Sequence, residues 1–151
     1  MNTLSALVDA QGALIDILLT LAGPDLLALR QKGAPLPQPV AARAVIDTGA
    51  DVTCLDSKLI VPLIASGLPP GKFLLTNLPA TGGLRPSMEY SVGLTIVHPS
   101  GRTRSNLVLR NQPVVEQALG SLGYDALIGR DVLDRCLLIY DGPGRRFSLA
   151  Y

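Results

Sequence analysis

Three aspartates, Asp47, Asp51 and Asp56, follow one another in the segment AVIDTGADVTCLD, residues 44–56. The two residues before Asp47 are strand formers, so Asp47 stands at the end of an apolar strand, where a carboxylate is costly to remove from water. A carboxylate in that position needs a hydrogen-bond or charge partner, or a functional role that justifies the cost. Two carboxylates that share a proton can activate water and polarise a carbonyl group, and several together can hold a cation.

Two simpler interpretations of this segment stay open. Asp, Thr and Gly all favour the ends of strands, so the DTG triplet could be an ordinary strand-to-turn junction. The three aspartates could also bind a cation, but their spacing lacks the alternating ligands of a calcium loop. No metal ligand is therefore predicted.

A second motif, ALIGRDVL at residues 126–133, puts an apolar run directly before Gly129 and a short amphipathic helix after it. Val132, Leu133 and Cys136 are spaced to share one face of that helix. Arg130 and Asp131 open the helix and could simply cap it in solvent.

Most of the remaining chain has the pattern of short strands separated by turns, which predicts an all-β barrel or sandwich. Two apolar runs around Asp9–Gly12 predict an N-terminal hairpin. The other predicted elements are a short helix near 23–33, a short helix broken or begun at Pro62, two consecutive hairpins over 72–110 and a C-terminal hairpin around 141–144.

The composition restricts the class of protein. A chain of 151 residues predicts one domain, 1–151, in which 1–40 form the hairpin and a connector. Apolar residues at 48% exclude disorder and suggest that some apolar surface meets a partner, and a net charge of +1 argues against nucleic acid and anionic membranes. With no signal peptide and no apolar run that could span a bilayer, we expect a cytoplasmic protein.

Cysteine and histidine offer no zinc pattern. Cys54 and Cys136 lie far apart in apolar surroundings, which predicts small core residues rather than a disulfide. His98 follows an apolar strand at a Pro-Ser-Gly turn, which predicts an exposed loop residue.

Taken together, VIDTGAD at 45–51, ALIGRDVL at 126–133 and the glycine-bearing hairpin between them resemble the retropepsin-like aspartic proteases. The resemblance covers residues from about 41 to the end of the chain. It implies a closed all-β barrel with one short C-terminal helix, a flap hairpin and a homodimer in which a longer C-terminal end supplies the dimer sheet. The implied activity is aspartic endopeptidase cleavage of a polypeptide by water, without metal or organic cofactor.

The same resemblance assigns roles to individual residues. Asp47 from each subunit forms the catalytic dyad, Thr48 hydrogen-bonds across it, and Gly49 lets the substrate backbone approach. Arg130 supports the loop through a buried pair with Asp51. The implied substrate-binding residues are Gly49, Asp51, Cys54, Thr81, Gly82, Gly83 and Leu127.

Two rival functions belong to other classes. A dimeric module with the same fold could bind an extended peptide without cutting it. A monomeric β-domain could bind a divalent ion through its aspartates. The segment ATGG at 80–83, taken here as the flap tip, could also be an ordinary loop.

Overall fold

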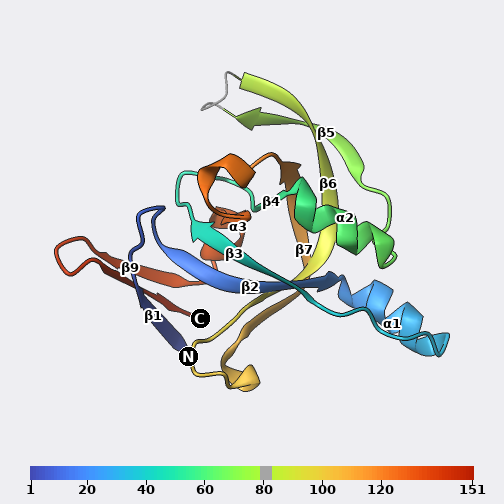
Figure 1. Cartoon of the computed structure of the whole chain (residues 1–151), viewed down its shortest axis with the longest axis horizontal. Helices are drawn as coiled ribbons and strands as arrows, with labels where there is room; N and C mark the ends of the chain where they lie inside the picture. The colour runs from blue at the N-terminus through green and yellow to red at the C-terminus, as the bar shows by residue number, and fades with distance from the viewer. Residues whose placement is uncertain (79–82) are drawn as a thin grey trace.

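The computed structural model of the chain describes residues 1–78 and 83–151 (Figure 1). Six strands pair in the order β2, β3, β8, β4, β7, β6, and β2 also pairs with β6, so the sheet closes on itself. The predicted closed barrel is confirmed. Its strands are β2 (Leu14–Leu21), β3 (Val40–Ile46), β8 (Ala126–Ile128), β4 (Cys54–Asp56), β7 (Leu107–Gln117) and β6 (Gly83–Ile96), and β5 (Lys72–Leu78) extends the sheet beyond β6.

A separate three-stranded sheet joins the two ends of the chain. It contains β1 (Thr3–Leu7), β10 (Arg146–Ala150) and β9 (Leu137–Asp141), in that order. The predicted turn at Asp9–Gly12 forms, but the predicted N-terminal hairpin is wrong, because β1 pairs with β10 whereas β2 pairs with β3 and β6. Each strand buries its apolar side chains against a distant partner, which a local pattern cannot reveal.

The barrel interior is filled by aliphatic side chains that alternate along the strands. Strand β2 shows the alternation most clearly, because Ile17, Leu19 and Leu21 are buried while Asp16 is exposed. Phe147 and Leu149 of β10 are fully buried in the same cluster. The small sheet and the barrel therefore share one apolar core.

In residues 1–78 and 83–151, three α-helices lie outside the barrel: α1 (Gly23–Gln31), α2 (Ser57–Ala65) and α3 (Arg130–Leu133). Helix α2 begins where the Asp56 side chain accepts the Lys58 N–H at 3.0 Å. Pro62 lies inside this helix, so the prediction that the helix breaks or begins there is wrong. The buried face formed by Leu59, Ile60 and Leu63 outweighs the one hydrogen bond that proline removes. Among the described residues, no helix is both long and apolar enough to cross a bilayer.

The two predicted central hairpins are confirmed. Strands β5 and β6 pair from Lys72↔Glu89 to Leu78↔Gly83, and β6 pairs with β7 from Ile96↔Leu107 to Glu89↔Val115. The β5–β6 hairpin therefore continues well past the last β6–β7 pair and projects over the end of the barrel that carries α3 (Figure 1). The C-terminal hairpin of β9 and β10 is also confirmed.

Candidate active site

The backbone fixes Asp47 at the carboxyl end of β3. Its N–H donates to the carbonyl oxygen of Ile128 in β8 at 3.0 Å, which continues the parallel β3–β8 pairing by one residue. The Gly49 N–H donates to Asp47 Oδ1 at 2.8 Å, and the Ala50 N–H donates to the Asp47 carbonyl oxygen at 3.2 Å. These bonds orient a half-buried carboxylate on a tight turn whose next two residues are exposed.

The two sequence motifs, residues 44–56 and 126–133, contact each other next to this turn. Gly129 lies so close to Val52 that a Cβ at position 129 would come within 2.5 Å of the Val52 carbonyl carbon. One residue later, the Arg130 N–H donates to the carbonyl oxygen of Ala50 at 2.9 Å. Glycine is therefore required at position 129 by the close approach of two backbones, and the first turn of α3 holds the loop that carries Asp47.

A hydrogen-bond network that the sequence did not predict completes this contact. Thr53 donates to Asp131 twice, from its N–H to Oδ2 at 3.1 Å and from Oγ1 to Oδ1 at 2.8 Å. Gln112 of β7 donates from Nε2 to Asp131 Oδ2 at 2.8 Å, and the Gly129 N–H donates to Thr53 Oγ1 at 3.2 Å. Asp131 is thus not the solvated helix cap that the sequence suggested, because its carboxylate oxygens accept hydrogen bonds from two buried residues, Thr53 before β4 and Gln112 in β7.

The predicted pair of Arg130 with Asp51 forms, from the guanidinium Nη2 to the carboxylate Oδ1. The other guanidinium nitrogen, Nη1, donates to the carbonyl oxygen of Thr48 at 2.9 Å. The prediction that this pair is buried is wrong for a single chain, in which the Asp51 side chain is 79% exposed and that of Arg130 48%.

An apolar cluster lies near Asp47, whose charge acts on both Cys54 and Tyr124. Cys54 pairs with Leu127 across β4 and β8, and both pack in a small cluster with Val115, Leu119 and Tyr124. Burial, with smaller contributions from the charges of Asp131 and Asp47, raises the pKa of the Cys54 thiol to about 11. The structure therefore brings together the two residues that the sequence assigned to the substrate pocket.

Tyr124 is a further candidate that the sequence analysis missed. Burial raises the pKa of its phenol, and the negative charge of Asp47 adds to that increase, which places the ring in the neighbourhood of the carboxylate. The one available signal was an aromatic residue in the glycine-rich loop LGSLGYD, directly before the second motif.

The third aspartate of the first motif has a structural task. Asp56 accepts the N–H groups of Lys58 at 3.0 Å and of Leu119 and Gly120 at 2.7 Å each. These backbone hydrogen bonds lower the pKa of the Asp56 carboxyl group. No group of three His, Cys, Asp or Glu side chains in residues 1–78 and 83–151 is arranged to hold a metal ion, so the alternative cation site is not assembled there.

The remaining predicted positions have mixed outcomes. Gly83 begins β6 opposite Leu78, whereas Thr81 and Gly82 lie outside the described residues. His98 is half-buried rather than an exposed loop residue, because its Nε2 lies 3.0 Å from the carbonyl oxygen of Thr3 in β1. Cys136 is half-buried and, like Cys54, carries a free thiol.

Comparison with known proteins gives a likeness of fold to solved structures. No family model and no curated protein matches the chain. Among solved structures, it is similar to a retropepsin-like aspartic protease from Rickettsia conorii, with a TM-score of 0.56 and 14% sequence identity over 99% of this chain and 90% of that one. At this level of identity the likeness concerns the fold, and the chain has a retropepsin-like barrel.

Proposed function

We propose that this protein is an aspartic endopeptidase that acts as a homodimer, with Asp47 of each subunit in the catalytic dyad. The observation that carries the proposal is the Asp47 carboxylate, which the Gly49 N–H orients at 2.8 Å near the apolar cluster of Cys54 and Leu127. The sequence contains one DTG triplet, so a second such carboxylate has to come from a second copy. The likeness of fold to a retropepsin-like aspartic protease supports the same function.

The chemistry follows from two carboxylates about one hydrogen bond apart that share a proton. The ionised member takes a proton from water as the water oxygen attacks the scissile carbonyl carbon, and the protonated member donates to the carbonyl oxygen. The tetrahedral intermediate collapses when the amide nitrogen is protonated and leaves. No bond forms between the enzyme and the substrate.

The other residues of the loop position these groups. The Gly49 N–H holds one oxygen of Asp47, and the absence of a side chain at Gly49 leaves room for a substrate backbone. Leu127 and Tyr124, which are partly exposed, offer apolar surface for a substrate side chain, and the buried Cys54 packs against them. Arg130 does not contact the Asp47 carboxylate but positions the loop by donating a hydrogen bond to the Thr48 carbonyl oxygen.

The small sheet offers a surface that suits a second copy. β9 is an edge strand, and its Leu137 and Ile139 are 55% and 57% exposed; Leu7 on the opposite edge strand is 70% exposed. An open edge with exposed aliphatic side chains favours strand pairing with another chain. The β9–β10 hairpin lies on the same side of the molecule as the end of β3 (Figure 1), which suits a dimer that pairs two Asp47 loops.

The decisive experiment compares the wild type with Asp47→Asn on a peptide library from acidic to neutral pH. We expect cleavage by the wild type, complete loss in Asp47→Asn with unchanged dimer mass, and full activity in the control Asp16→Asn, an exposed aspartate on β2. Mixing equal amounts of wild type and Asp47→Asn under conditions of subunit exchange should leave about a quarter of the dimers with both aspartates. A wild type that binds peptides but cuts none at any pH would favour the non-catalytic peptide-binding module.

A further inference from the structure

A pocket of about 540 Å³ lies between α1 and the outer face of the barrel. Residues of α1 form one wall, and the other wall comes from the end of β2, from Gly93–Thr95 of β6 and from Val108–Arg110 of β7. Because Leu94 and Leu109 are buried in the barrel core, their neighbours along each strand point outward, toward α1. We call this space the helix pocket. None of its residues belongs to the Asp47 loop, β8 or α3.

The helix pocket exists because neither of its walls fills the space between them. The sheet contributes Thr20, Gly93 and Thr95, which are small. Gly93 cannot carry a side chain, since a Cβ atom there would collide with Thr20 Oγ1 and lie 2.9 Å from the Leu21 carbonyl oxygen. On the other wall, α1 has no buried residue, and its Leu27 is 55% exposed. A helix of nine residues gains most of its stability from packing, so a ligand that fills the pocket would stabilise α1.

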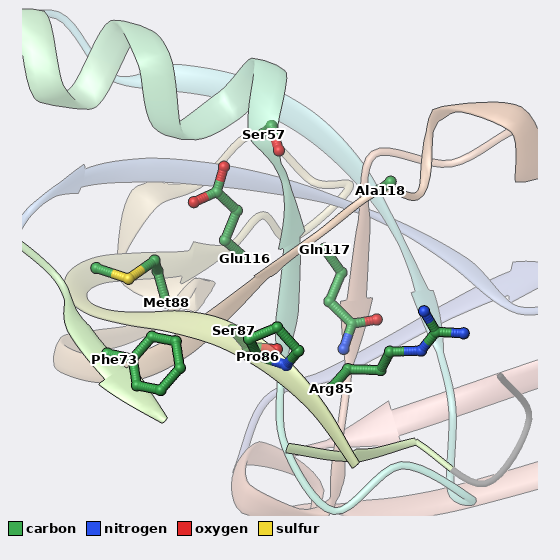
Figure 2. Close-up of a pocket in the computed structure, with 9 residues that line it drawn as sticks. All are labelled: Ser57, Phe73, Arg85, Pro86, Ser87, Met88, Glu116, Gln117 and Ala118. Carbon is green, nitrogen blue, oxygen red and sulfur yellow. The ribbon is translucent and has the colours of Figure 1, made fainter. Parts of the chain in front are cut away.

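The charged groups that line the helix pocket are all positive. Arg30 and Arg110 line it, and no acidic residue of the described chain does. Neither guanidinium group has an ion-pair or hydrogen-bond partner in residues 1–78 and 83–151. The larger pocket beside the β5–β6 hairpin, of about 690 Å³, is different, because Arg85 and the acidic Glu116 both line it (Figure 2). The helix pocket therefore favours an anion, whereas the larger pocket has no preferred sign of charge.

Arg110 is the cation whose position has no structural explanation. Arg30 lies in the last turn of α1, where a positive charge suits the helix dipole. Arg110 lies at the opposite end of the helix, since a Cβ atom at Gly23 would be 3.4 Å from the Cβ of Arg110. The helix dipole is positive at that end, and Asp25 in the first turn offsets part of this field without lining the pocket. Arg110 and the start of α1 together form a place for a negative group.

The rest of the helix pocket suits an apolar chain. Leu27 and Val108 line it from opposite walls and are 55% and 54% exposed, so both leave apolar surface in water that a ligand can cover. The volume lies within the range of about 300–1,000 Å³ that is common for small-molecule sites. A small hydrophilic anion would leave this apolar surface uncovered, and a cationic amphiphile would meet two arginines.

We propose that the helix pocket binds an anionic amphiphile, an aliphatic carboxylate, whose chain lies between α1 and the sheet and whose carboxylate pairs with Arg110. A guanidinium group can donate two parallel hydrogen bonds to a carboxylate, which fixes the orientation of the ligand. The bound chain covers Leu27 and Val108 and ties α1 to β7. This binding site is separate from Asp47 and does not depend on the proposed protease function.

The probe is decanoate below the concentration at which it forms micelles, and isothermal titration calorimetry on the full chain measures its dissociation constant. We expect one site per chain. Hexanoate has the same head group and a shorter chain, so it should bind at least about tenfold more weakly. Decyltrimethylammonium has the same chain length and a positive head group, so it should not bind.

Two pairs of variants test the position of the ligand. Arg110→Gln should raise the dissociation constant of decanoate at least about tenfold, and Val108→Ser at least about threefold. The matched controls are Arg104→Gln in the turn between β6 and β7 and Val61→Ser on α2, both outside the pocket, and they should leave the constant unchanged. All four side chains are exposed, so the variants should fold, which circular dichroism checks. Saturating decanoate should raise the Tm of the wild type and of Arg104→Gln but not that of Arg110→Gln.

Three results would overturn the proposal: no binding of decanoate, equal dissociation constants for Arg110→Gln and Arg104→Gln, or binding of decyltrimethylammonium as tight as that of decanoate. A leucine-rich hexapeptide with a free carboxyl end provides the last comparison. If it binds more tightly than decanoate, the ligand is the end of a peptide and the aliphatic carboxylate is wrong. None of these measurements requires cleavage, so they decide the site whether or not the protein is a protease.

Discussion

Thr53 and Asp131, 78 residues apart in the chain, hold each other through two hydrogen bonds of 3.1 and 2.8 Å. Thr53 is fully buried, and its hydroxyl group also accepts the Gly129 N–H. The pair therefore joins the segment after the DTG triplet to the first turn of α3. The position of the Asp47 loop depends on this polar link.

Removal of the Asp131 carboxylate should destabilise the protein strongly. Asp131→Ala leaves the Thr53 N–H, the Thr53 hydroxyl group and one N–H of Gln112 Nε2 without an acceptor, so we expect a loss of about 2–4 kcal/mol in the free energy of unfolding. Urea denaturation followed by circular dichroism measures the loss. Asp134→Ala, an exposed aspartate four residues from Arg130, is the control and should change stability by less than about 0.5 kcal/mol. Equal changes in the free energy of unfolding for the two substitutions would show that the hydrogen bonds of Asp131 do not stabilise the protein.

Arg130 should affect catalysis more than stability. Its pair with Asp51 is exposed, so Arg130→Ala should lower the free energy of unfolding by about 1 kcal/mol or less. The Nη1 bond to the Thr48 carbonyl group aligns the loop beside Asp47, so we expect kcat for a cleaved peptide to fall about tenfold or more. Arg130→Lys should restore stability but not kcat, because one ammonium group cannot serve both acceptors in the planar geometry of a guanidinium group. Full activity in Arg130→Lys would rule out this positioning role.

The β9 edge should carry the dimer. Ile139→Lys places a charge on the exposed face of the edge strand, so it should shift the protein to single-chain mass in sedimentation experiments and abolish peptide cleavage. The fold should survive, because Ile139 is 57% exposed in the single chain. Leu27→Lys on α1, where the side chain is 55% exposed, is the matched control and should stay dimeric and active. Dimers of Ile139→Lys with normal activity would place the interface elsewhere.

Stability should fall at alkaline pH partly through Cys54. The folded protein keeps the Cys54 proton up to a pKa of about 11, whereas the unfolded chain releases it near the ordinary value of 9.0. Between these values the unfolded state binds fewer protons, so stability decreases as pH rises, by a total on the order of 2–3 kcal/mol. Urea denaturation at several pH values between 8 and 11 measures this loss. Cys54→Val should lose less stability over the same range, and identical curves for the two proteins would contradict the assignment.

Local patterns in the sequence predicted where Asp47 and Gly129 lie along the chain but few of the contacts that support them. Asp47 and Gly129 each stand at a strand end followed by a turn, and short-range propensities describe such junctions well. Thr53 and Gln112 donate to Asp131, which lies in a different element of the fold. Tyr124 packs against Cys54 and Val115, which lie in other strands. These contacts arise only when strands from different parts of the chain meet, so periodicity within one segment cannot indicate them.

The same distinction explains the fold-level outcome. The barrel was predictable because many short amphipathic strands must bury their apolar faces somewhere. The partner of β1 was not predictable. The alternation of apolar and polar residues in β1 suits a hairpin with β2 through the Asp9–Gly12 turn as well as it suits the observed pairing with β10. The separation of β6 from β7 was likewise hidden, because β6 reads as one continuous strand in the sequence.

Pairing of β1 with β10 sets an order on folding during synthesis. Thr3 lies opposite Ala150, and the Asn2 N–H donates to the Tyr151 carbonyl oxygen at 2.8 Å, so β1 cannot pair until β10, more than 130 residues later, has left the ribosome. β2 likewise needs β6 before the barrel can close. Such a high contact order predicts slow folding and a nascent chain in which β1 and β2 stay exposed until their partner strands have been synthesised. Protection of these strands by a chaperone would then matter more for the yield of this protein than the stability of the finished barrel.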